Sequence, residues 1–125
     1  ALLGRFEGFG VVTGRPRAEA VWTLRRHLSG VDGALVAMED TAEDKPHPEP
    51  VLRGQRLAGG RTAAYVGDSV DDMAAATAAG MFAVAVLGPG RTWQSGWPER
   101  LYLAGADVVF ADINEAVAWL AREGD

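Results

Sequence analysis

The amino-acid sequence predicts an α/β fold, in which a Rossmann-like parallel sheet of about five strands is flanked by helices. Short apolar runs alternate with amphipathic segments along the chain, which is the pattern of β-α units. One such run ends at Gly67-Asp68, and a helical pattern follows from Ser69 to Gly80. The 125 residues are 48% hydrophobic, which is enough material for one domain with its own core.

The first half of the chain is expected to form two strands and two helices. Residues 10–13 make the first strand, and Pro16 suits the first turn of the next helix because its missing N–H is not needed there. The second strand spans residues 34–38. A connector with three prolines, Lys45-Pro46-His47-Pro48-Glu49-Pro50, cannot be a continuing helix or a central strand. A helix over about residues 49–57 follows it.

The second half repeats the alternation of strand and helix. Its expected strands are residues 62–66, 82–87 and 107–110. The final helix opens with Asp112 and Glu115, which have the spacing of a capping box. Residues 88–105 are the least regular stretch, and we expect a loop with a short helix there.

Composition excludes several classes of protein. The net charge of −5 argues against general affinity for nucleic acid. The absence of cysteine excludes a disulfide framework and thiolate metal sites. No stretch approaches the roughly 18 apolar residues of a membrane span, and the first residues lack the pattern of a signal peptide. We therefore expect a cytoplasmic protein with no membrane partner.

Three short motifs follow one another along the predicted strands. Val11-Val12-Thr13-Gly14-Arg15 ends a strand in a hydroxyl residue, Lys45 opens the proline connector, and Gly67-Asp68-Ser69-Val70-Asp71-Asp72 ends a strand in carboxylates. A carboxylate at the carboxyl end of a parallel strand, where a helix begins, is placed to hold a metal over the edge of a sheet. In order and spacing, the three motifs resemble the second, third and fourth motifs of the haloacid dehalogenase superfamily, over roughly residues 9–87.

That resemblance implies a Mg²⁺-dependent phosphatase and gives each motif a role. Thr13 and the neighbouring N–H of Gly14 would hold the phosphoryl group, and Lys45 would neutralise the phosphate and the nucleophile. Asp68 would coordinate Mg²⁺ with support from Asp72. These residue types suit the chemistry, because phosphoryl transfer needs positioning and positive charge around the equatorial oxygens. The implied substrate is a small phosphorylated metabolite, which the sequence does not identify.

The family's first motif, Asp-x-Asp, does not occur in the 125 residues. In the family its first Asp is the nucleophile that forms an aspartyl-phosphate, and its second is the acid/base group. We therefore expect Ala1 to lie within a longer protein, just after an inserted cap domain. Residues 1–125 would then be the C-terminal part of the core domain, inactive alone but derived from a phosphomonoester hydrolase.

The missing motif also removes a strand. In the family this strand lies between those that end at Thr13 and Asp68, so here the two must pair directly, leave a slot, or borrow a strand from another chain. Exposed strand edges invite association, and we predict a dimer or a strand-swapped assembly. We also predict weak Mg²⁺ binding, because only Asp68 and Asp72 remain of the family's ligand set.

Other interpretations stay open at this stage. Asp68 could simply cap the helix, as Ser69 could, and Asp71 is expected to be a surface acid. A non-catalytic, degenerate relative that binds phosphate or supports assembly shares the same residues and is the main alternative. A dinucleotide-binding domain and a P-loop NTPase are disfavoured, because neither Gly-x-Gly-x-x-Gly after the first strand nor Gly-Lys-Ser/Thr is present.

Overall fold

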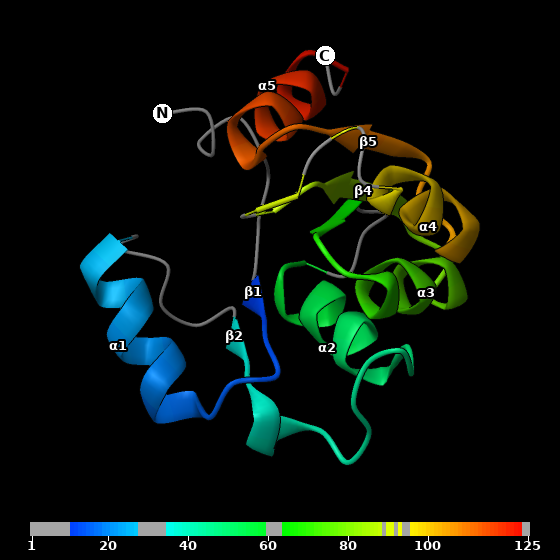
Figure 1. Ribbon diagram of the computed structural model, residues 1–125. Coiled ribbons are helices and arrows are strands. Elements are labelled where there is room, and N and C mark those ends of the chain that lie inside the picture. The colour runs from blue at the N-terminus through cyan, green and yellow to red at the C-terminus, as the bar shows by residue number, and fades with distance from the viewer. Residues whose placement is uncertain are drawn as a thin grey trace.

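The computed structural model describes residues 11–27, 35–59, 64–88, 90, 91, 93 and 96–123, and it confirms the α/β class (Figure 1). The elements follow in the order β1 (Val11–Val12), α1 (Arg17–His27), β2 (Leu35–Val36), η2 (Met38–Asp40), α2 (Glu49–Leu57), β3 (Ala64–Gly67), α3 (Val70–Ala78), β4 (Phe82–Val86), α4 (Trp97–Ala104), β5 (Val108–Phe110) and α5 (Ile113–Glu123). Each apolar run that the sequence assigned to a strand contains one.

The described strands form two parallel sheets. β1 pairs with β2 in parallel, and β3, β4 and β5 pair in parallel in that order. Between the sheets lies a cavity of about 330 Å³, which we call the strand slot. Val12 and Thr13 from the end of β1 line it, together with Tyr65, Val66 and Gly67 of β3. Of the three outcomes expected for a missing central strand, the described residues therefore show the slot.

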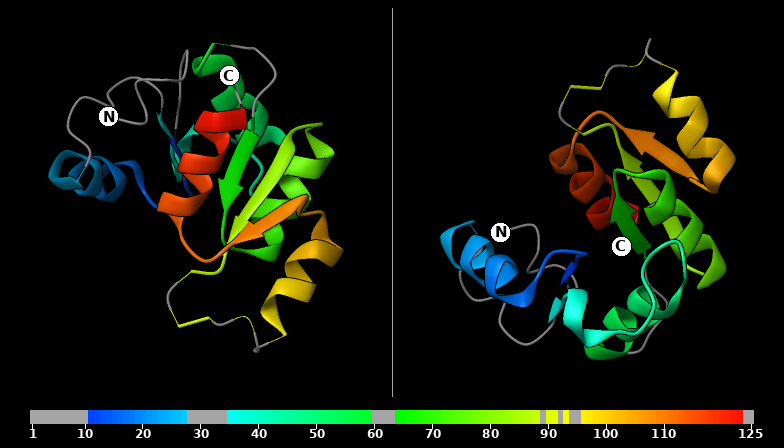
Figure 2. Two further views of the ribbon diagram at one scale, coloured as in Figure 1. Left: turned by 90° about the horizontal axis from the view of Figure 1, so that it is seen from above. Right: turned by 60° about the horizontal axis from the view of Figure 1, so that its bottom comes forward.

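Helices cover both faces of the three-stranded sheet. α3 and α4 lie on one face and α5 lies on the other (Figure 2). The first face holds the largest fully buried side chains, such as Met73 and Leu101. On the second face Trp119 stacks on Phe82 at 5.8 Å between ring centroids and also contacts Phe110. No helix within the described ranges combines the length and the apolar character that a membrane crossing requires.

α2 joins the two sheets, because it packs on β1 and β2 and also contacts α3. The approach to β1 is close: a Cβ on Gly54 would lie 2.6 Å from Cγ2 of Val12. Only glycine lets the helix backbone come this near to the strand. Pro50 and Val51 are buried on the same helix, so α2 is anchored along its first two turns.

The structure shifts some predicted boundaries. β2 ends at Val36 rather than Met38, because Ala37 N donates to Oδ2 of Asp40 and the chain turns into η2. The predicted cap of the last helix is confirmed, since Glu115 N donates to Oδ1 of Asp112 at 3.0 Å. The short helix expected within residues 88–105 is α4. Residues 10, 34, 62 and 63 of the predicted strands lie outside the described residues.

Candidate functional site

The carboxyl ends of β1, β2 and β3 border one open cavity of about 400 Å³, which we call the cleft. All five residues that the motifs singled out line it: Thr13, Gly14, Lys45, Asp68 and Asp72. The cleft adjoins the strand slot, because four of these five line both cavities and Gly14 lines the cleft alone. Segments far apart in the sequence therefore bring a hydroxyl, an ammonium group and carboxylates to one place.

Lys45 reaches into the cleft from the proline connector and meets two partners. Its Nζ donates to Oδ1 of Asp72 at 2.7 Å and to the hydroxyl of Tyr65 at 3.3 Å. Burial alone would lower the pKa of Lys45, but electrostatic attraction by Tyr65 and the hydrogen bond and charge of Asp72 outweigh it and raise the pKa. The group is therefore an ammonium at neutral pH. An ammonium has three N–H donors, so one remains for a ligand.

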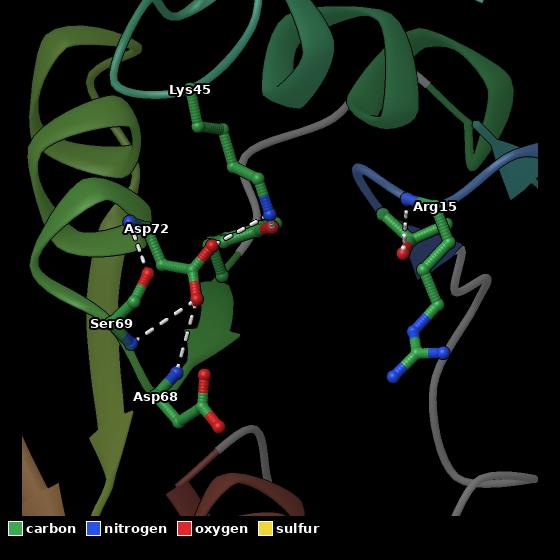
Figure 3. A network of polar contacts seen from close by, with 7 residues as sticks. Arg15, Lys45, Asp68, Ser69 and Asp72 are labelled. Atoms are coloured by element: carbon green, nitrogen blue, oxygen red, sulfur yellow. Dashed lines mark hydrogen bonds and ion pairs between the residues drawn. The ribbon is translucent and has the colours of Figure 1, made fainter. Parts of the chain in front are cut away.

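Asp72 is fully engaged by the protein itself (Figure 3). Ser69 caps α3 by accepting from Asp72 N at 3.0 Å, and Oδ2 of Asp72 accepts from the N–H groups of Ser69 and Asp68 at 3.3 and 3.1 Å. Ser69 and Asp72 therefore form a capping box, and the other carboxylate oxygen of Asp72, Oδ1, accepts from Lys45. A Cβ on Gly67 would lie 2.5 Å from Cβ of Asp72, so glycine is needed for α3 to begin this close to β3.

Asp68 presents a carboxylate to the cleft, which Asp44 and Asp71 also line. Ser69 caps α3 in its place, and in Figure 3 the side chain of Asp68 turns away from Asp72. The side chain borders both the cleft and the strand slot. Gly88 packs closely against this side chain: a Cβ on Gly88 would lie 3.1 Å from Oδ2 of Asp68.

These residues fit a magnesium ion only in part. Mg²⁺ is commonly bound through one or two carboxylates, with waters and substrate phosphate oxygens completing the octahedron. Asp68 offers one such carboxylate, whereas both oxygens of Asp72 already have partners. Within the described ranges no three His, Cys, Asp or Glu side chains come together as a metal site. The ligand role of Asp68 and the weak binding of Mg²⁺ stay predictions.

Thr13 is held at the edge of the cleft by its own backbone. Thr13 N donates to Val36 O at 2.9 Å, and its Oγ1 accepts from Arg15 N at 3.2 Å. As the hydroxyl accepts this bond, its proton is still free for donation to a ligand. Nothing lies within 4 Å of the place where a Cβ of Gly14 would be, so the backbone here is open to the cleft. The Arg15 side chain is exposed and pairs with Glu19.

Tyr65 belongs to the site although no motif pointed to it. Its hydroxyl contacts Lys45, and the ammonium lies 5.9 Å from the centre of its ring. Burial raises the pKa of Tyr65, and the negative charge of Asp72 adds to this while Lys45 opposes it. The alternation of side chains along a strand places Tyr65 on the same face as Gly67, under which Asp72 lies. The alternation of side chains along the strand is therefore the feature of the sequence from which the position of Tyr65 could have been predicted.

Other residues that the sequence drew attention to have ordinary structural places. Nδ1 of His47 accepts from Glu49 N at 3.1 Å, at the start of α2. Asp71 is exposed at the rim of the cleft. The side chain of His27 lies outside the described residues.

Comparisons with known proteins show which family the chain resembles. The family model described as haloacid dehalogenase-like hydrolase matches residues 6–86. The imidazoleglycerol-phosphate dehydratase of Phytophthora nicotianae is 40% identical over 86 residues, which are 66% of this chain and 19% of that protein. The chain thus spans about a fifth of the curated relative it matches.

Solved structures share the fold at low sequence identity. A haloacid dehalogenase-like protein from Agrobacterium tumefaciens superimposes with a TM-score of 0.73 at 23% identity, over 99% of this chain and 59% of that one. A protein named as a beta-phosphoglucomutase from Thermotoga maritima gives 0.69 at 21% identity, over 90% and 51%. Because the family model covers all three motifs and more than half of the chain, the chain belongs to the haloacid dehalogenase-like hydrolases.

Proposed function

We propose that this chain is the phosphate-holding and metal-holding part of a Mg²⁺-dependent phosphomonoester hydrolase. The observation that carries the proposal is the meeting of Thr13, Lys45 and Asp68 at one cleft, where strands of both sheets end. A hydroxyl donor, an ammonium group and a carboxylate able to take a metal are the groups that phosphoryl transfer requires.

Each residue has a distinct task in this proposal. The third N–H of Lys45, the Thr13 hydroxyl and the backbone N–H of Gly14 bind the phosphoryl oxygens. Asp68 would hold Mg²⁺, which when bound supplies positive charge to those oxygens. Asp72 keeps Lys45 in position through its 2.7 Å contact and in this structure acts as an anchor for the ammonium.

The nucleophile of the reaction is not among the 125 residues, which contain no Asp-x-Asp. We expect the carboxylate of an Asp in a longer protein to attack the phosphorus and break the bond to the ester oxygen, which leaves as the alcohol after taking up a proton. Water would then hydrolyse the aspartyl-phosphate and release inorganic phosphate. The chain alone then binds phosphate weakly and hydrolyses nothing. The substrate is a small phosphorylated metabolite, in keeping with the beta-phosphoglucomutase named among the structural neighbours.

A non-catalytic role is the second candidate, and two observations favour it. No Asp-x-Asp is present in the sequence, and both oxygens of Asp72 are bound within the protein. In that case the cleft would bind phosphate, or the domain would support assembly, without any turnover.

The test uses a longer protein in which these residues follow an Asp-x-Asp motif. With Mg²⁺ it should hydrolyse p-nitrophenyl phosphate, and Asp68→Asn should remove this activity. Asp71→Asn is the matched control, because Asp71 borders the same cleft but is exposed and should leave the rate unchanged. Phosphate binding without hydrolysis in the longer protein would favour the non-catalytic role.

A further inference from the structure

We propose that Tyr65 is a working part of the phosphate site: its hydroxyl fixes the direction of the Lys45 ammonium and donates its own proton to a phosphoryl oxygen. The inference rests on the proposed function, since it deepens the description of the same site. It assigns a role to a side chain that lies outside the three motifs.

The contacts of Lys45 define where its free N–H must point. Asp72 takes one donor at 2.7 Å and Tyr65 takes a second at 3.3 Å, from α3 and β3 respectively. With two of the three N–H groups fixed by separate elements, the ammonium cannot rotate freely. The two hydrogen bonds that are already made therefore fix the direction of the third N–H. Lys45 lines both the cleft and the strand slot, so this N–H lies near their common border.

No acceptor within the described ranges takes the proton of the Tyr65 hydroxyl. A phenol donates one hydrogen bond and accepts others, and an ammonium can only donate, so Tyr65 must be the acceptor in its contact with Lys45. Among the described residues, Lys45 is the hydrogen-bond partner of this hydroxyl. The nearby carboxylate of Asp72 is already occupied by Lys45 and by two backbone N–H groups.

The proton can be accepted where the strand slot opens into the cleft. Thr13 and Lys45 line both cavities and Tyr65 lines the slot beside them, so two hydroxyl donors and one ammonium donor border this junction. A phosphate group presents several oxygens that each accept charge-assisted hydrogen bonds. Because burial raises the pKa of Tyr65, the hydroxyl keeps its proton at neutral pH.

The ring and the hydroxyl of Tyr65 can be separated experimentally. The ring packs beside the buried core that contains Met73 and Leu101. Tyr65→Phe keeps this packing and removes only the hydroxyl. The chain has two tyrosines, and the other, Tyr102, is 50% exposed on α4. Tyr102→Phe is therefore the matched control for the same chemical change.

The first measurement is titration of the chain with inorganic phosphate by calorimetry. We expect Tyr65→Phe to weaken binding about tenfold, as for loss of a hydrogen bond to a charged group. Tyr102→Phe should bind as the unaltered chain does, and Lys45→Met should not bind. An unaltered chain that does not bind phosphate overturns the proposed function, and this inference with it.

The second measurement is spectroscopic and does not require Tyr65→Phe to fold. In Tyr102→Phe, Tyr65 is the remaining tyrosine, so the Raman band of its ring that responds to hydrogen bonding of the phenol can be followed as phosphate is added, separately from the signals of the four tryptophans. A hydroxyl that donates to phosphate shifts this band, and a residue with a purely structural role does not. If phosphate binds but the tyrosine band stays constant and Tyr65→Phe binds equally well, the role of Tyr65 is overturned alone.

Discussion

At the scale of single residues, Lys45 supports the fold as well as the site. Its side chain is 18% exposed and that of Asp72 is 10% exposed, so the pair is largely out of water. Lys45→Met leaves a buried carboxylate without its cation, which should lower the free energy of unfolding by about 3 kcal/mol. Urea denaturation of the variant measures this loss. Arg56→Met removes an exposed cation from the end of α2 and should cost under about 0.5 kcal/mol; equal losses in the two variants would contradict the prediction.

The same residues give the stability a dependence on high pH. The pKa of Lys45 and that of Tyr65 are both raised in the folded protein, from ordinary values of 10.5 and 10.0. Groups with a raised folded pKa bind protons more tightly when folded, so their contribution is complete below those ordinary values and is lost as pH rises through the folded pKa. We expect the free energy of unfolding to fall as the solution becomes more alkaline than the ordinary pKa of tyrosine. Denaturation at a series of pH values checks this, and an equal slope in Tyr65→Phe would count against it.

At this scale, the sequence predicts the location of those site residues that belong to a motif. Thr13, Lys45 and Asp68 could be placed at one edge of the sheet because each follows a strand or a fixed connector. The pairing of Asp72 with Lys45 could not be predicted, since it depends on how closely α3 approaches β3 at Gly67. Strand alternation gives the face of β3 on which Tyr65 lies, but its contact with Lys45 depends on where the proline connector runs.

At the scale of elements, α2 is the piece whose packing can be tested most sharply. Alanine at Gly54 would favour the helix by about 1 kcal/mol in an exposed position. Here its Cβ would lie 2.6 Å from Cγ2 of Val12, a branched side chain with little freedom to move. Overpacking of this kind costs about 1–3 kcal/mol, so Gly54→Ala should destabilise the protein.

Val12→Ala provides the control for this clash, because it removes the methyl group that Gly54→Ala would meet. In the Val12→Ala background the same substitution at Gly54 should become neutral or stabilising. The four proteins form a double-mutant cycle, measured by chemical denaturation. If the effects of the two substitutions on the free energy of unfolding are additive, contact with Val12 is not the reason that alanine at position 54 destabilises the protein.

The elements themselves followed from the sequence more closely than their ends did. Predicted residues 49–57 coincide with α2, because prolines before it and glycines after it set both limits. β2 is shorter than its apolar run, because Ala37 N donates to the side chain of Asp40 and the chain turns directly after Val36. A contact between a side chain and a backbone N–H three residues earlier leaves no trace in hydrophobic periodicity.

At the scale of the whole molecule, the described strands divide into two sheets with the strand slot between them. The sequence predicts parallel strands and a missing neighbour, but it cannot say whether β1 and β3 would close on each other. They stay apart, because α2 is held against β1 and β2 while β3 is held by β4 and α3. The edges of β1 and β3 that border the strand slot therefore have no strand partner within the described residues.

Unpaired edges of this kind lead us to predict a dimer or a strand-swapped assembly of the chain. Sedimentation velocity should show a species larger than the monomer that grows with concentration. Ala64→Lys places a charge on the exposed start of β3 and should shift the population toward the monomer. A monomer at every concentration, together with one cooperative melting transition, would rule the assembly out.

The position of α2 between two small sheets has a further consequence for the order in which the molecule opens. β1 and β2 share only two paired positions, whereas β4 is bonded on both sides and its Ala83, Val84 and Ala85 are buried. Cooperative units with few buried contacts exchange their amide hydrogens through local openings, well before global unfolding. Native-state hydrogen exchange should therefore separate the chain into two classes, with amides of β1 and β2 exchanging early and those of β4 persisting longest. A ligand that bridges Thr13 at the end of β1 and Asp68 at the end of β3 would slow the early class, so exchange would report the joining of the two sheets directly.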